Sequence, residues 1–421
     1  MPQVLCYPRR FDFDMDDKLK GLVMINLEMK GGGKMKKVLI GFVAIASLLL
    51  VTYGSSYAIQ GQCVNCHTMH ASQNGTFPTG MTSGPNEYLL LAGCIACHSG
   101  ATGTATNSFS APIVLRTSGV PGGQGGTYTL AGGDFYWVAD SGANTDSMGH
   151  NVVGISGQDA AIAANIGYTP PGWHAGATPG QLGDGQVNAG VATWSNQLNC
   201  AGQLGCHGKH DVVGDFPGIK GAHHGNTGIA TTQANNPTTV GGSFRFLSGI
   251  NGLEHSQWNW GETTGLHNEY NGDNNTANRN QSYTTYANKR TISYLCAECH
   301  GYYHSQIDDS TTGTPWLRHP TDIVLGRGAG TEYSAYNPDA ANAYSLEAPV
   351  ARPTVPATSS ATVLPTDSSG DTGAIVMCLS CHRAHGSNQA DILRWDYTAM
   401  IAGSGTSDTG CFTCHTTKNA D

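Results

Sequence analysis

The chain has 421 residues, of which only 12% are charged, and a formal net charge of −9. It contains 57 glycines and no sustained helical period of apolar residues, so an ordinary aliphatic core is excluded for a chain of this size. Because the chain is acidic and poor in Lys and Arg, binding of nucleic acid through its phosphates is not expected.

Residues 35–58 read MKKVLIGFVAIASLLLVTYGSSYA. Two lysines precede an apolar run that ends in small residues, which is typical of a cleaved signal peptide. A transmembrane anchor is the alternative, although the run is slightly short for a full span. We expect translation to begin at Met35, which makes residues 1–34 a misassigned start; a genuine N-terminal extension is the alternative.

The remaining chain, residues 59–421, is expected to form a single domain. Eight of the 21 Lys and Arg and five of the 30 Asp and Glu precede it, which leaves it a net charge of −12. The segments 133–140 and 243–247 are candidate strands, and 350–373 is expected to be an extended loop.

Twelve of the 13 cysteines lie in this part, and they form six pairs, each followed directly by histidine. The pairs are Cys63/Cys66-His67, Cys94/Cys97-His98, Cys200/Cys206-His207, Cys296/Cys299-His300, Cys378/Cys381-His382 and Cys411/Cys414-His415. Five have two residues between the cysteines, and the third has five.

Cys-x-x-Cys-His is the attachment signature of c-type haem. On a helical turn, positions i, i+3 and i+4 share a face, so two thiols can form thioethers with one haem while the histidine ligates its iron. Zinc sites and disulfides are the alternatives. Repetition behind an export signal favours haem, and short helical turns are expected at the motifs.

Eleven histidines lie outside the motifs, which exceeds the six distal ligands that six haems need. Methionine could serve instead, with Met69, Met81, Met148, Met377 and Met400 available. Four extra histidines follow a motif by three or four residues: His70, His210, His304 and His385. Since the two axial ligands approach opposite haem faces, each of these is expected to ligate a neighbouring haem and to bring haems into contact. The alternative is that these four histidines are exposed to solvent or hydrogen-bonded to loops.

Short stretches in order along the chain carry a family resemblance: CVNCHTMH (63–70), GGDFYWV (132–138), GHNVV (149–153), FRFLSG (244–249), LRHP (317–320) and CLSCHRAH (378–385). Through them the chain resembles the OmcS type of extracellular hexahaem c-type cytochrome, which polymerises into conductive filaments in metal-reducing bacteria. The resemblance implies a multihaem cytochrome fold, mostly irregular coil with short helices and few short strands, wrapped around a chain of stacked haems.

The resemblance also implies six covalently bound c-type haems with two histidine ligands each. The motif histidines would be proximal, and the distal ligands would be His70, His150, His210, His304, His319 and His385. Five histidines have no counterpart and are expected on the surface or in loops: His174, His223, His224, His255 and His267.

By the same resemblance, His70 would ligate a haem of the next protomer in a homopolymer. The expected function is extracellular electron transfer, with periplasmic or outer-membrane cytochromes as donors and external metals or cells as acceptors. The location would be extracellular or on the outer surface, with the periplasm as runner-up. A discrete carrier that does not polymerise is the alternative. A multihaem enzyme is disfavoured, because it needs an open iron while all six motifs end in histidine and distal histidines are in surplus.

The third motif departs from the family pattern. Gly202 and Gly205 would let its insertion bulge outward while both thiols still reach one haem. A haem held by Cys206 alone is the alternative, and a disulfide would leave His207 and His210 without a role.

Overall fold

The structure is a computed structural model of the whole chain. It describes residues 63–68, 88–90, 93–101, 103–108, 111–121, 130–139, 146–173, 193–225, 238–254, 263–274, 288–304, 319, 321–325, 333, 335–365, 373–404 and 409–418. The expected signal peptide (35–58) and His70 lie outside these residues.

Regular secondary structure is short throughout the described residues. The α-helices are α3 (Cys94–His98), α4 (Tyr136–Ala139), α5 (Ala160–Ile166), α6 (Asp215–Gly218), α7 (Ala222–Gly225), α9 (Ile292–Ala297), α10 (Gly301–His304) and α11 (Cys378–Cys381). The 3-10 helices are η1 (Cys63–Asn65), η2 (Asp146–Met148), η3 (Gly202–Leu204), η4 (Val240–Gly242), η5 (Phe244–Phe246), η6 (Pro338–Ala340), η7 (Ala390–Ile392), η8 (Tyr397–Ala399) and η9 (Gly410–Thr413). The expected mixture of coil, short helices and few strands is confirmed.

The strands form two-stranded pairs only, within the part of the chain that the structure describes. The parallel pairs are β1 (Ser99–Ala101) with β2 (Leu115–Ser118), and β3 (Asn199–Ala201) with β4 (Gly205–His207). The antiparallel pairs are β5 (Gly252–Leu253) with β6 (Glu269–Tyr270), and β7 (Ile323–Val324) with β8 (Ile375–Val376).

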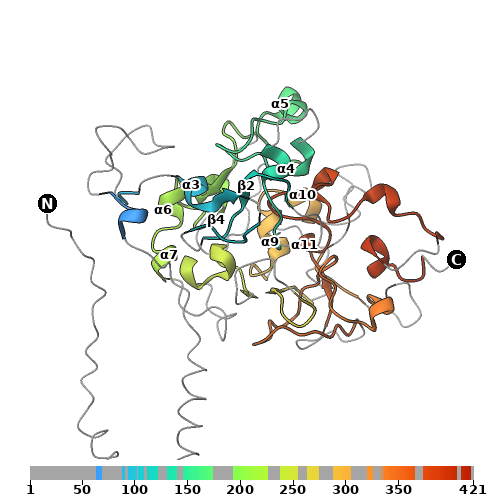
Figure 1. The fold of residues 1–421 in the computed structure, drawn as a ribbon. Coiled ribbons are helices and arrows are strands. Elements are labelled where there is room, and N and C mark those ends of the chain that lie inside the picture. The colour runs from blue at the N-terminus through green and yellow to red at the C-terminus, as the bar shows by residue number, and fades with distance from the viewer. Residues whose placement is uncertain are drawn as a thin grey trace, which may run out of the picture.

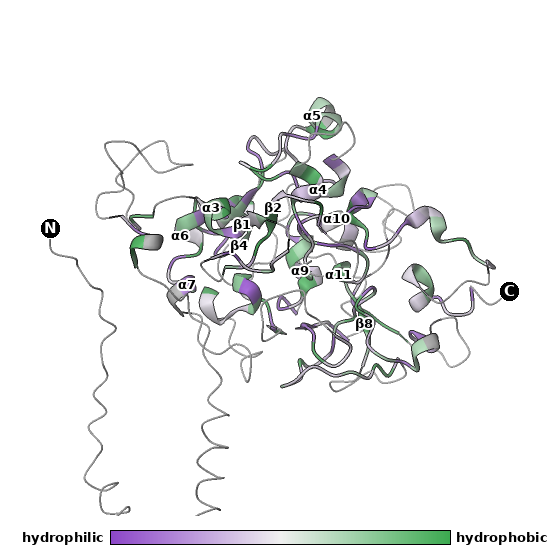
Figure 2. Cartoon of the chain, viewed as in Figure 1, coloured by the Kyte–Doolittle hydropathy of each residue, from purple (hydrophilic) through white to green (hydrophobic). Residues whose placement is uncertain are grey.

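These elements follow one another across the molecule roughly in chain order (Figure 1). α3 and β4 lie toward one end, α9 and α11 in the middle, and the C-terminal residues toward the other end. Hydrophobic and hydrophilic residues alternate along the chain without forming one apolar layer (Figure 2). None of the helices in the described part combines the length and apolar character that a membrane span requires.

The prediction of a strand at 133–140 is wrong, because Tyr136–Ala139 is helical. Asp134 starts this turn: its Oδ1 accepts hydrogen bonds from the backbone N–H of Tyr136 (2.9 Å) and of Arg116 (3.1 Å). An aspartate that bonds its own backbone two residues ahead favours a turn over an extended chain.

The prediction of a strand at 243–247 is also wrong. Arg245 and Phe246 have φ of +49° and +61°, in the left-handed region that a strand excludes. The buried Glu254 stabilises this bend, since its Oε1 accepts the Arg245 N–H at 2.6 Å.

Small apolar clusters take the place of one large core. The largest packs Phe244, Ile292, Tyr294, Ile375 and Met377 with their neighbours, and it lies directly against the fourth and fifth motifs through Cys296 and Leu379. These two motif segments are therefore packed against the interior.

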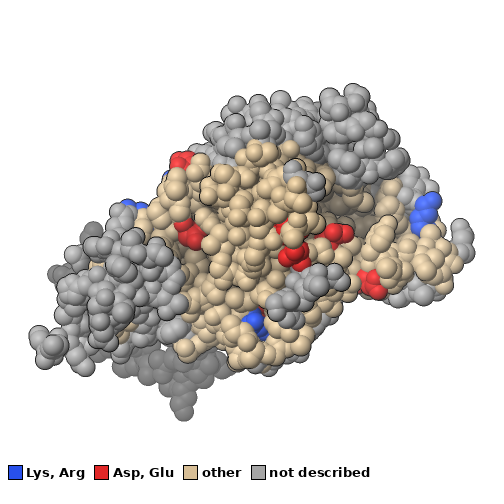
Figure 3. All heavy atoms as spheres, turned by 90° about the horizontal axis from the view of Figure 1, so that it is seen from above, with Lys and Arg blue, Asp and Glu red and all other residues tan. Residues whose placement is uncertain are grey.

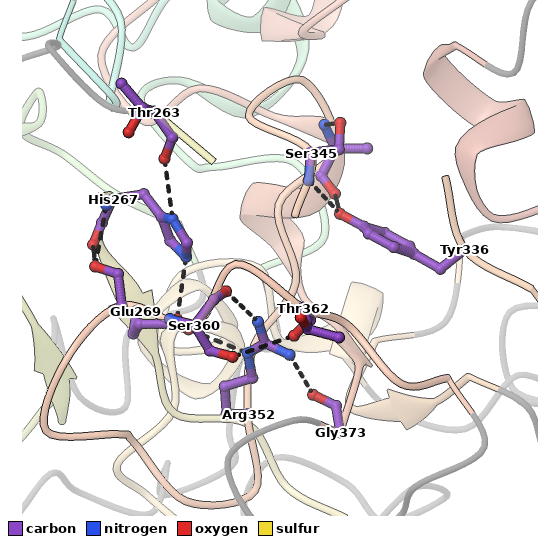
Figure 4. Close-up of polar contacts among 11 residues, drawn as sticks. Thr263, His267, Glu269, Tyr336, Ser345, Arg352, Ser360, Thr362 and Gly373 are labelled. Carbon is purple, nitrogen blue, oxygen red and sulfur yellow. Dashed lines mark hydrogen bonds and ion pairs between the residues drawn. The ribbon is translucent and has the colours of Figure 1, made fainter. Parts of the chain in front are cut away.

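A buried polar network joins residues 263–269 to the segment expected to be an extended loop (Figure 4). The fully buried Arg352 donates to Glu269 Oε2 (3.1 Å) and to the carbonyls of Ser360 and Gly373. His267 is buried rather than on the surface, with Nε2 3.0 Å from Glu269 Oε1. The described part of 350–373 is thus irregular but firmly held.

Charged side chains are sparse on the face shown in Figure 3. This view agrees with the low charged fraction of the sequence and the excess of acidic over basic residues.

Candidate haem-attachment sites

Each regular motif lies on a tight helical turn, as the spacing predicts. The cysteines and histidine of the second motif make up α3, and those of the others lie on or beside η1, α9, α11 and η9. In four motifs the histidine N–H donates to the carbonyl of the first cysteine, four residues earlier: His67 (2.8 Å), His300 (2.9 Å), His382 (3.1 Å) and His415 (3.0 Å). This turn places both sulfurs and the imidazole on one side.

The second cysteine closes the same turn in three of these motifs. Its N–H donates to the carbonyl of the first cysteine three residues earlier: Cys66 to Cys63 (3.1 Å), Cys299 to Cys296 (3.2 Å) and Cys414 to Cys411 (3.2 Å). None of the twelve described cysteines forms a disulfide, which leaves every sulfur for attachment to a haem. In the loaded protein these thiols would be thioethers.

The Cys66 thiol makes a hydrogen bond with the Cys97 thiol of the second motif. The spacing predicts that Cys66 joins Cys63 on the haem of the first motif, and this stays a prediction. Burial, the charge of Cys66 and this hydrogen bond together raise the pKa of the Cys97 thiol. Cys66 is half-buried whereas Cys63 is exposed, so the two sulfurs of the first motif have unequal surroundings. A thioether at Cys66 would replace this contact between thiols.

In the third motif, a strand pair instead of a helical turn brings the two cysteines to one face. Asn199 pairs with Gly205 and Ala201 with His207 in parallel register, so Cys200 and Cys206 lie opposite each other. Neighbouring strands are about 4.8 Å apart and opposite residues project from the same face. Ala201 and Gly205 are buried while Cys206 is exposed, so the cysteine face points out of the pair.

The inserted residues fold back onto the protein and do not bulge outward as expected. Gly202 is buried with φ +78°, and the Gln203 N–H donates to the Val212 carbonyl at 2.8 Å. Asp215 Oδ1 accepts the Ala201 N–H at 2.8 Å. Gly202 is needed for its positive φ, whereas Gly205 has φ −130° and is needed because a Cβ would meet the Ala201 backbone.

Five of the six motif histidines place Nδ1 against a backbone carbonyl. The pairs are His67 with Tyr88 (2.8 Å), His98 with Pro112 (3.0 Å), His207 with Arg245 (2.9 Å), His300 with Pro171 (2.6 Å) and His382 with Asp391 (2.8 Å). Because a carbonyl only accepts, Nδ1 carries the proton and Nε2 is the nitrogen left to bind iron.

Four motif histidines face a second imidazole at nearly constant separation. The ring centres are 6.2 Å apart for His98 and His223, 6.4 Å for His207 and His385, 6.2 Å for His300 and His150, and 6.1 Å for His415 and His319.

This separation fits an iron held between the two rings. Two metal–imidazole bonds of about 2.0 Å, plus about 1 Å from each nitrogen to its ring centre, give roughly 6 Å. Stacked rings in direct contact would be closer, as for His267 and Tyr344 at 3.5 Å. The residues therefore fit c-type haem with two histidine ligands.

Burial keeps these imidazoles neutral, which ligation requires. It lowers the pKa of His300 to about 4, helped by the charge of His150, and lowers the pKa of His385 to about 3. Burial also lowers the pKa of His98, His150 and His207.

Besides Cys66 and Cys97, other sulfurs of successive motifs also lie close together. Cys94 and Cys200, from the second and third motifs, lie with Asp215 in a group whose ligand atoms are within 4.8 Å of one another. Their hydrogen bond and burial raise the pKa of the Cys94 thiol, and a hydrogen bond to Cys378 with burial does the same for Cys296. Haems attached at these sulfurs would therefore lie in contact.

The remaining expected distal ligands are placed differently. His210 is buried, with Nδ1 2.8 Å from Glu298 Oε2 in the fourth motif and Nε2 3.3 Å from the Cys206 carbonyl. The side chain of His304 lies outside the described residues.

Comparison with known proteins also favours attachment of c-type haem. The family model named "Doubled CXXCH motif" matches residues 372–420, which hold the last two motifs. The C-type cytochrome OmcS of Geobacter sulfurreducens (strain ATCC 51573 / DSM 12127 / PCA) is 28% identical over 88% of this chain and 89% of its own. The chain is therefore similar to a c-type cytochrome over most of its length.

Two solved structures are also similar. The outer membrane cytochrome S filament of Geobacter sulfurreducens has 21% identity and a TM-score of 0.38, covering 82% of this chain and 85% of its own. The OmcS nanowires of Geobacter sulfurreducens, determined by cryo-EM, have 20% identity and a TM-score of 0.45, covering 82% and 86%. The paired motif and the similarity to a c-type cytochrome indicate covalently bound haem c in this chain.

His223 was expected on the surface or in a loop, and sequence reasoning did not place it at a haem. It lies opposite His98, the proximal histidine of the second motif. The spacing of the motifs contains no signal for this partner, and only the fold brings the two histidines together.

Proposed function

We propose that this protein transfers electrons outside the cell through six c-type haems, as the repeating subunit of a filament. The observation that carries the proposal is the set of four histidine pairs at 6.1–6.4 Å. An iron with two imidazole ligands has no position for substrate, so the haem would change only its oxidation state.

The distal histidine of each pair comes from a distant part of the chain. His385 follows the fifth motif but faces His207 of the third, while His150 faces His300 of the fourth. Ligation would thus bind one motif to another and hold neighbouring haems at fixed separation. The contacts between sulfurs of the first and second, second and third, and fourth and fifth motifs support electron transfer between the haems of those motifs.

Haem c supplies the electron-carrying iron in this proposal, and the chain's residues hold it. The cysteines would fix its edge and Nε2 of the histidines would bind the iron, while the backbone carbonyls at Nδ1 set the ring orientation. The two solved structures are named as an outer membrane cytochrome filament and as nanowires. We assign filament assembly to this chain, with a location outside the cell or on its outer surface.

Polymerisation is tested at His70, the residue proposed to ligate a haem of the next protomer. In His70→Ala, mass spectrometry should still find six haems per chain, one haem should become high-spin, and negative-stain microscopy should show monomers. Filaments from His70→Ala with every haem low-spin would refute ligation across protomers. Wild-type protein that carries its haems but stays monomeric would instead show a discrete carrier.

A further inference from the structure

We infer that His223 is the distal iron ligand of the haem attached at Cys94 and Cys97. This inference rests on the proposed haem function and goes beyond it, because neither the motif pattern nor the family resemblance assigns His223 any role.

The ring separation is that of the other pairs. His98 and His223 have ring centres 6.2 Å apart, and the other three pairs have centres 6.1–6.4 Å apart. The planes of His98 and His223 are at 43°, close to the 44° of His207–His385 and the 48° of His150–His300, whereas those of His319–His415 are at 83°. A loop histidine near His98 by chance has no reason to reproduce the common separation.

Local structure holds His223 in this position. It lies on the short helix α7, and the preceding Ala222 is buried with its N–H bonded to the Ile219 carbonyl at 2.9 Å. The His223 ring also lies near the Phe246 ring, with centres 5.5 Å apart and planes tilted by 36°. The backbone and this aromatic neighbour therefore both restrict the imidazole.

The partner is equally well oriented. His98 Nδ1 lies 3.0 Å from the Pro112 carbonyl, which leaves Nε2 as the nitrogen to bind iron.

His224 adjoins His223 and could take over as the iron ligand in a variant that changes His223 alone. His224→Ala is therefore the matched control. We would compare His224→Ala with the double variant His223→Ala/His224→Ala, each as full-length holoprotein. Haem number is measured by mass, and spin state by optical and electron paramagnetic resonance spectra of the ferric protein.

The double variant should keep the wild-type haem number and contain one more high-spin haem than His224→Ala, and added imidazole should restore the low-spin state. Equal numbers of high-spin haems in the two proteins would overturn the assignment. A wild type without covalent haem would refute the proposed function instead, so the two failures are distinguishable.

The double variant His223→Met/His224→Ala keeps the test decisive if removal of the imidazole unfolds the protein. A His/Met pair raises the reduction potential of a c-type haem. One haem of this variant should therefore remain low-spin and titrate at a higher potential than in the wild type. A redox titration identical to that of the wild type would overturn the assignment.

Discussion

Gly149 is the position at which packing and iron ligation can be perturbed together. It precedes His150, and its backbone bridges to Gly386 beside His385. An added Cβ would lie 2.7 Å from Val138 Cβ and Cγ1 and 2.9 Å from the His385 carbonyl oxygen. Carbon atoms in contact prefer about 3.5–4.0 Å, so Gly149→Ala must displace its surroundings by about 1 Å.

The expected cost is about 1–3 kcal/mol in the free energy of unfolding, the usual range for overpacking a filled interior. The displacement would also move His150, whose Nδ1 is 2.7 Å from the Ala384 carbonyl and whose ring is 6.2 Å from His300. Ligation at a fixed bond length does not tolerate a shift of this size, so part of one haem should become high-spin.

Gly157→Ala is the matched control, because a Cβ there would meet nothing within 4 Å. It should be neutral or stabilising by up to about 1 kcal/mol, since it restricts only the unfolded chain. Guanidinium denaturation of both holoproteins, with ferric spectra, checks the prediction. Equal unfolding free energies and fully low-spin spectra in both variants would refute the packing described around His150.

Two further predictions concern stability alone. Arg352→Met leaves the buried Glu269 without its charged partner and should lower the free energy of unfolding by about 3–5 kcal/mol. The control Arg290→Ala, at an exposed position, should change the free energy of unfolding by less than about 0.5 kcal/mol. Similar denaturation midpoints for the two variants would contradict the network of Figure 4. Thr291→Ala removes the cap of α9, where Thr291 Oγ1 accepts the Tyr294 N–H at 3.0 Å, and should cost about 1 kcal/mol. Thr291→Ser keeps the hydroxyl, so thermal unfolding should separate it from Thr291→Ala.

The local parts of the sites could be predicted well, because spacing within one turn sets their geometry. Cys-x-x-Cys-His determines which atoms share a face, and the helical turns at His98 and His382 follow from it. The partners across the iron, and the contact of Cys66 with Cys97, could not be predicted in this way. His150 bonds a carbonyl 234 residues away, and no period in the sequence encodes such a contact.

The two wrong strand predictions have a common physical cause. Both segments are rich in aromatic residues, which favour strands when only pattern is considered. In each, a carboxylate bonds backbone N–H groups and forces a turn: Asp134 in one segment and Glu254 in the other. Such hydrogen bonds depend on the side chain's surroundings, which the pattern does not contain.

The third motif shows what the insertion changes and what it preserves. Parallel strands usually need a long crossover, but η3 connects β3 to β4 within three residues. Two residues between the cysteines would be too few to form this connection. Two sulfurs still share a face and His207 still follows the second. Support for His207 now comes from residues 245–246, since Arg245 accepts from its Nδ1 and Gly208 donates to Phe246 at 2.7 Å. Because the Phe246 ring also packs on His223, a change in this bend would disturb the second and third sites together.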